Sequence, residues 1–152
     1  MTTKAAWSQE EWKTIVDAPS MAGLGVMKAD FGLLSAAKEF KELIKSQTEA
    51  KDKYKGCELI QAIVADLATK SDQTSEASAE AVSLDAIVTQ VKNATTWVKQ
   101  KATADEAALY TKFIVETAER VANASGEGFF GGGPKVSESE EAFLKQVRAA
   151  VA

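Results

Sequence analysis

Hydrophobic side chains recur along this chain with the spacing of amphipathic helices. Leu84, Ile87, Val88 and Val91 stand at positions i, i+3, i+4 and i+7, which share one face of a helix. The same periodicity predicts helices at 9–17, 19–29, 33–50, 55–70, 84–101, 104–124 and 138–150. From Leu33 to Ser125 there is no proline and a single glycine, whereas hairpins need turn residues at short intervals. The pattern therefore predicts an all-α fold, with a four-helix-bundle core and additional short helices at its ends.

The expected helix starts carry local signals. Ser83 is a predicted N-cap, and Trp7 can pack on Trp12 as a hydrophobic staple. Pro19 suits the first turn of a helix, which separates 9–17 from 19–29. An open alternative joins 19–29 to 33–50 in one helix kinked near 30–32. Three further sequences match the Ser/Thr-x-x-Glu capping box, namely Ser8–Glu11, Thr103–Glu106 and Ser137–Glu140.

The length of 152 residues suits one helical domain covering 1–152. The polar, serine-rich segment near 71–82 is predicted to be a mobile loop, and the glycine-rich segment 125–136 a second loop. Gly126 is expected to end the helix before that second loop in a left-handed conformation.

Composition narrows the chemistry. The chain contains no histidine, which excludes Ser-His or Cys-His nucleophile pairs and His-ligated metals, so neither enzyme activity nor a cofactor is expected. The net charge of −4 argues against binding to nucleic acid. No stretch approaches the roughly 20 apolar residues of a membrane span, and the expected location is the cytoplasm. Cys57, the sole cysteine, cannot form an internal disulfide and is expected to be buried.

The glycine-rich loop matches nucleotide-binding motifs only superficially. Gly126, Gly128 and Gly131 have the G-x-G-x-x-G spacing, but a helix precedes them where the dinucleotide fold needs a strand. Within the loop, Phe129 and Phe130 either tuck under the end of the bundle or stay exposed and dock a partner.

Two other features have a structural and a functional interpretation. The segment 18–32 is apolar on nearly all sides, so it is either buried centrally or, through Met21 and Met27, able to open for a ligand or a partner helix. Glu116 and Glu119 stand three residues apart, a spacing that suits a carboxylate-only metal site but more often a solvated, salt-bridged face.

The segments 12–24 and 124–133 resemble parts of small, uncharacterised helical proteins from bacteria. The resemblance covers less than a third of the chain. It implies a compact all-helical fold and brings no activity.

The sequence therefore favours a non-enzymatic helical bundle that acts by binding a protein partner or by self-association. The surfaces predicted for this are Met21, Met27, Phe129 and Phe130. The alternative is a carrier or sensor of a small apolar ligand, held in a cavity lined by Met21, Met27, Phe40 and Phe113. Binding of a divalent metal by carboxylates alone is a third hypothesis.

Overall fold

The computed structural model describes residues 2–29, 36–70, 83–124 and 138–152, with the backbone alone at 36–40, 70 and 124. Within these residues there is no strand, and the all-α class is confirmed. The predicted loops at 71–82 and 125–136, and the proposed kink near 30–32, lie outside them. The helices are η1 (Lys4–Ala6), α1 (Gln9–Ala29), α2 (Ala36–Lys53), α3 (Glu58–Lys70), α5 (Leu84–Lys101), α6 (Ala104–Ala124) and α7 (Glu138–Val151).

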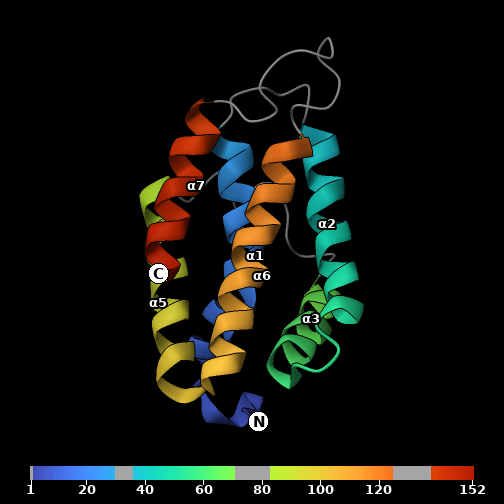
Figure 1. Ribbon diagram of the computed structural model, residues 1–152, viewed down its shortest axis with the longest axis vertical. Helices are drawn as coiled ribbons and strands as arrows, with labels where there is room; N and C mark the ends of the chain where they lie inside the picture. Colours follow the sequence, from blue (N-terminus) through green and yellow to red (C-terminus); the bar gives the residue numbers. More distant parts are fainter. Residues whose placement is uncertain (1, 30–35, 71–82, 125–137) are drawn as a thin grey trace.

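Helices α1 and α6 lie side by side at the centre and run in the same direction (Figure 1). Helices α5 and α7 pack on one side of this pair, and α2 and α3 on the other. All six α-helices of the described residues contribute buried apolar side chains to one core cluster. None of these described helices is both long and apolar enough to cross a membrane.

The predicted caps form where the structure describes them. Ser8 Oγ accepts a hydrogen bond from the Glu11 N–H at 3.1 Å, and the Glu11 carboxylate accepts one from the Ser8 N–H at 2.9 Å. Ser83 Oγ accepts from the Ala86 N–H at 3.1 Å. The ring centroids of Trp7 and Trp12 are 5.6 Å apart, as the staple predicts. Ser137, of the third predicted box, lies outside the described residues.

The second capping box does more than start α6. Glu106 is buried and accepts hydrogen bonds from the Thr103 N–H at 3.1 Å and from both the N–H and the hydroxyl of Thr2 at 3.0 and 2.6 Å. Burial opposes ionisation of this carboxyl group, but the hydrogen bonds from Thr2 and Thr103 outweigh it and lower the pKa of Glu106 to about 2. Its carboxylate thus fastens the N-terminal segment to α6.

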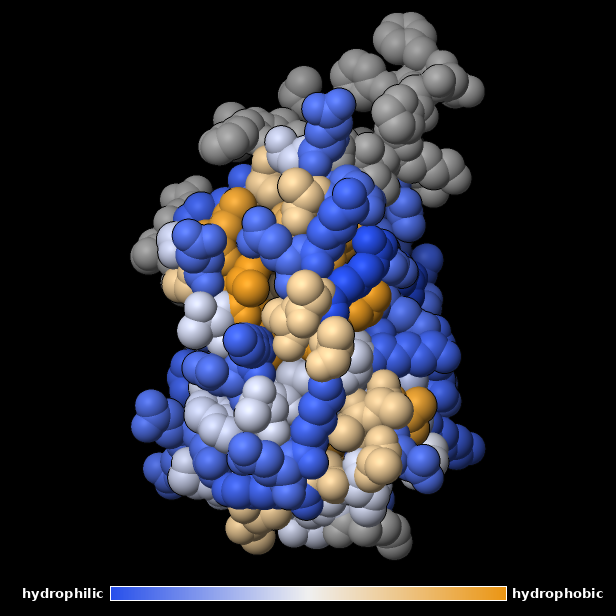
Figure 2. All heavy atoms as spheres, turned by 60° about the vertical axis from the view of Figure 1, so that its left-hand side comes forward, coloured by the Kyte–Doolittle hydropathy of each residue, from blue (hydrophilic) through white to orange (hydrophobic). Residues whose placement is uncertain are grey.

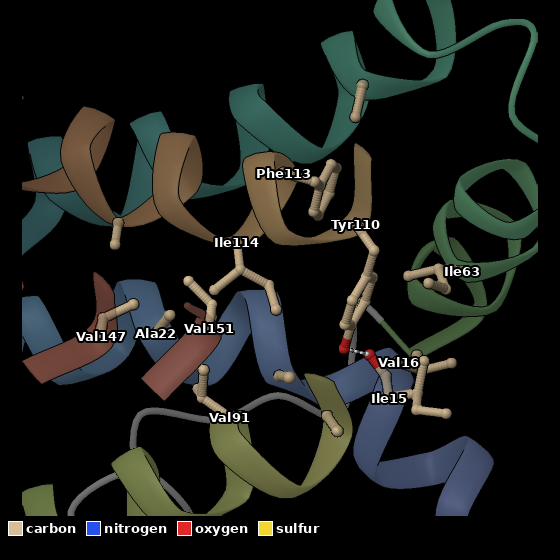
Figure 3. Packing of buried hydrophobic residues seen from close by; sticks show 14 of the residues in the cluster. Ile15, Val16, Ala22, Ile63, Val91, Tyr110, Phe113, Ile114, Val147 and Val151 are labelled. Carbon is tan, nitrogen blue, oxygen red and sulfur yellow. Dashed lines mark hydrogen bonds between the residues drawn. The ribbon is translucent and has the colours of Figure 1, made fainter. Parts of the chain in front are cut away.

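The predicted helix boundary at Pro19 was wrong, because α1 is continuous from Gln9 to Ala29. Proline has no N–H, so the carbonyl of Ile15 lacks its usual helical donor four residues later. The hydroxyl of Tyr110, from α6, donates to this carbonyl at 2.7 Å (Figure 3). Burial raises the pKa of the Tyr110 hydroxyl well above its ordinary value, so it remains a donor. A tertiary hydrogen bond therefore replaces the missing local one, and buried side chains on both sides of Pro19 hold the helix together.

The apolar second half of α1 is buried, as the first of its two interpretations predicted. A Cβ atom on Gly25 would overlap the ring of Phe143 from α7. A Cβ atom on Gly23 would lie 2.7 Å from Leu43 Cδ1 of α2. The two glycines therefore let side chains from opposite sides reach the α1 backbone.

Candidate functional site

A hollow of about 220 Å³ lies between α2 and α6. Its floor consists of Ser46 and Ala50 of α2, Tyr54 directly after α2, and Phe113 of α6. The first three lie on one face because they are four residues apart and the Tyr54 N–H still donates to the Ala50 carbonyl. All four side chains are buried. The Tyr54 and Phe113 rings pack edge to face with centroids 5.8 Å apart. The floor of the hollow is therefore mostly apolar and aromatic.

The Glu116 carboxylate, at the edge of the hollow, accepts two side-chain hydrogen bonds. Glu116 Oε2 accepts hydrogen bonds from the Tyr54 hydroxyl at 2.7 Å and from Lys53 Nζ at 2.6 Å. Partial burial opposes ionisation of Glu116, but the bonds from Lys53 and Tyr54 outweigh it and lower its pKa. Burial, followed by the bond to Glu116, raises the pKa of Tyr54. At neutral pH the carboxyl group is therefore ionised and the phenol protonated.

Arg120 spans the opposite edge of the hollow. Its guanidinium donates to Glu49 at 2.6 Å and to Glu42 at 3.2 Å. The hydrogen bond from Arg120 lowers the pKa of Glu49, and the same hydrogen bond raises the pKa of Arg120. This edge is therefore a fixed ion-pair cluster that joins α2 to α6.

A chain of hydroxyl groups lies beneath these charges. Thr117 Oγ1 donates to the carbonyl of Phe113 at 2.8 Å, and it lies 3.2 Å from Ser46 Oγ. Thr117 has one hydroxyl hydrogen, so Ser46 must be the donor between the two hydroxyls. The lone pairs of Ser46 Oγ therefore remain available as acceptors at the wall of the hollow.

A second, more open hollow of about 510 Å³ lies where α5, α6 and α7 meet. Lys99 there donates to the carbonyls of Val151 and Ala152 at 2.9 and 2.7 Å. Apart from Lys99, the residues that line this second hollow are mostly small, namely Ala104, Ala107, Ala108, Thr111 and Val151. On the side of the molecule that carries α5 and α7, apolar residues lie in patches between hydrophilic ones (Figure 2). This hollow offers few polar groups for recognition, so the α2–α6 hollow is the stronger candidate.

The structure brings only part of the sequence-predicted site together. Met21 and Met27 are partly exposed, pack against the core, and line neither of these two hollows. Phe113 lines the α2–α6 hollow. Phe129, Phe130 and the Phe40 side chain lie outside the described residues.

The carboxylates of Glu116 and Glu119 line the α2–α6 hollow and are partly exposed and salt-bridged, as the second of their two interpretations predicted. No group of three or more metal-ligating side chains occurs in the part of the chain that the structure describes. The sequence interpretation missed Tyr54, Glu49 and Arg120. The usable signal was the spacing of Ser46, Ala50 and Tyr54, a face of small and aromatic residues within a charged helix.

No protein family matches this chain, and neither a curated protein nor a solved structure shows significant similarity to it.

Proposed function

We propose that this protein is a non-enzymatic binding protein that holds a small polar molecule in the hollow between α2 and α6. The observation that carries the proposal is the layered build of the hollow. A buried floor of Ala50, Tyr54 and Phe113 lies beneath a rim of ionised groups. Seven of the ten described lining residues are polar or charged, and oriented polar groups of this kind fix the orientation of a bound ligand and provide specificity.

The pKa values of the titratable groups in the hollow favour ligand binding over acid–base catalysis. General acid–base catalysis works best when the pKa of the catalytic group lies near the working pH. In this hollow the pKa values of Glu49 and Glu116 are lowered, whereas those of Tyr54 and Arg120 are raised. All four shifts move the titration away from neutrality, so these groups present fixed charges and dipoles.

The volume limits the ligand. Sites for drug-sized molecules enclose roughly 300–1,000 Å³. The α2–α6 hollow, at about 220 Å³, suits a smaller compound. The ionised groups of the rim favour a polar ligand over the apolar ligand of the carrier hypothesis.

The test is an NMR titration of ¹⁵N-labelled protein with a set of small amines, acids and neutral polar compounds. We expect amide shifts at Ser46, Ala50, Phe113 and Arg120 for at least one compound. Asn123 is exposed at the rim, so Asn123→Trp should cover the hollow and abolish these shifts. The matched Asn93→Trp, on an exposed position of α5, should leave them unchanged. If no compound shifts these amides, or if both variants respond alike, the proposal is wrong.

Partner binding or self-association through Met21, Met27, Phe129 and Phe130 stays a prediction, and so does the cytoplasmic location. Changing Phe129 and Phe130 to serine should leave the fold intact and remove the partner. As a finer description of the fold we propose a four-helix core of α1, α2, α5 and α6. The packing of α1 on α5 and α6, and of α6 on α2, supports it.

A further inference from the structure

We propose that the α2–α6 hollow selects a small organic cation, whose ammonium group takes the position that Lys53 Nζ occupies beside Glu116. This inference rests on the proposed function and names the class of ligand. The Lys53 side chain serves in it as an internal stand-in for the ligand.

The position of Lys53 Nζ shows that an ammonium group fits. It lies 2.6 Å from Glu116 Oε2 and 5.7 Å from the centroid of the Tyr54 ring. A carboxylate together with an aromatic ring within about 6 Å is a favourable setting for a cation. An ammonium group in this position therefore interacts with both a carboxylate and an aromatic ring.

The two donors to Glu116 differ in how firmly they are held. Tyr54 is buried and packed on Phe113, so its hydroxyl orients the carboxylate whether or not Lys53 is present. The Lys53 side chain is 53% exposed and ends a flexible stem. Exposed ion pairs contribute little to stability, so a ligand can displace Lys53 at small cost.

The cations that line the hollow are already paired with carboxylates, which disfavours an anion. The lining holds two cations, Lys53 and Arg120, and three carboxylates, Glu49, Glu116 and Glu119. Two further cations approach these carboxylates from outside the lining: Lys112 lies 3.8 Å from Glu116, and Arg148 lies 2.9 Å from Glu119. An anion would have to draw Arg120 away from both Glu49 and Glu42. A cation, by contrast, meets the Glu116 carboxylate, which the Tyr54 hydroxyl holds in place.

The experiment compares n-butylammonium with butyrate, which have the same alkyl chain and opposite charge, by ¹⁵N NMR titration. We expect n-butylammonium to shift the amides around Ser46 and Phe113, and butyrate to leave them unmoved. Lys53→Met removes the competing ammonium group and should tighten n-butylammonium binding about two- to fivefold. Lys51→Met, a matched change at an exposed position, should alter it far less.

Glu116→Gln should weaken n-butylammonium binding about two- to fivefold, because an ammonium–carboxylate pair at this partly exposed place contributes less than about 1 kcal/mol. Circular dichroism checks that this variant is folded, and the gain expected for Lys53→Met does not depend on it.

The outcomes separate this inference from the proposed function. Binding of butyrate at the same amides would overturn the cation inference and leave the proposed function standing. Binding of other compounds there, without binding of n-butylammonium, would have the same consequence. No binding by any compound overturns both. Equal responses of Lys53→Met and Lys51→Met would show a bulk charge effect and overturn the stand-in role.

Discussion

The hydrogen bond from Tyr110 to Ile15 should contribute more to the free energy of unfolding when Pro19 is present than when it is replaced. Tyr110→Phe removes the hydroxyl that donates to the Ile15 carbonyl at 2.7 Å in a fully buried setting. Because Pro19 has no N–H, the carbonyl is then left without its helical donor. An unsatisfied buried acceptor costs about 1–3 kcal/mol, so the free energy of unfolding should fall by about that amount. In a domain of this size each kcal/mol lowers the Tm by roughly 2–4 °C.

The Pro19→Ala background tests the reason for this loss. The alanine introduced there has an N–H that can bond to the Ile15 carbonyl, so Tyr110→Phe should destabilise Pro19→Ala less than it destabilises the native sequence. Urea unfolding followed by tryptophan fluorescence and by circular dichroism measures all four proteins of the cycle. We expect a coupling free energy of at least about 1 kcal/mol, well above the roughly 0.5 kcal/mol scatter of independent sites.

Tyr54→Phe is the matched control for this cycle. It removes the same hydroxyl group, but one that donates to the partly exposed Glu116 and shares no hydrogen-bond partner with Pro19. Its effect should be the same in both backgrounds. If Tyr110→Phe also has equal effects in both, the hydroxyl does not compensate for the proline, and the explanation given for the continuity of α1 is refuted.

Three further predictions concern packing, pH and capping. Gly25→Ala should destabilise the protein by about 1–3 kcal/mol, because the added methyl group meets the buried ring of Phe143. Gly23→Ala should cost less than Gly25→Ala in the same thermal melts, because its closest contact is the end of a flexible leucine, its contact with Val121 is 3.3 Å, and it gains helix propensity; equal losses would contradict this. The pKa of Glu106 is lowered from 4.5 to about 2, so its contribution to stability is full above pH 4.5 and is lost as the pH falls towards 2. The stability advantage over Glu106→Gln should therefore shrink across that interval in urea titrations, and a constant difference would refute the assignment. Ser83→Ala should cost about 0.5–2 kcal/mol in urea unfolding through loss of the α5 cap, and no change would refute that role.

Local signals predicted the parts of the fold that depend on neighbouring residues. The bounds of α5 and α6 matched the prediction, because the apolar repeat and the caps at Ser83 and Thr103 act within one or two turns. The helix expected at 33–50 runs on to Lys53, and the one expected at 55–70 begins only at Glu58. Such shifts arise where a helix end lacks a strong cap, since the periodicity of side chains does not mark the final turn.

The α2–α6 hollow was only partly predictable. The sequence placed Phe113 beside a ligand and noted Glu116 as one of a carboxylate pair, but it could not join either of them to Tyr54 and Arg120. Tyr54 and Glu116 are 62 residues apart along the chain. Their meeting depends on the register of two packed helices, which the spacing within one helix does not specify.

The sequence by itself determined that this chain forms amphipathic helices and, through its composition, that histidine chemistry is closed to it. Tertiary structure decided what Pro19 does and where a ligand could bind. A proline removes a local hydrogen bond, and only packing between helices shows whether a donor from elsewhere replaces it. Here Tyr110, 95 residues from Ile15, is that donor, and a break that local rules predict becomes the middle of the central helix.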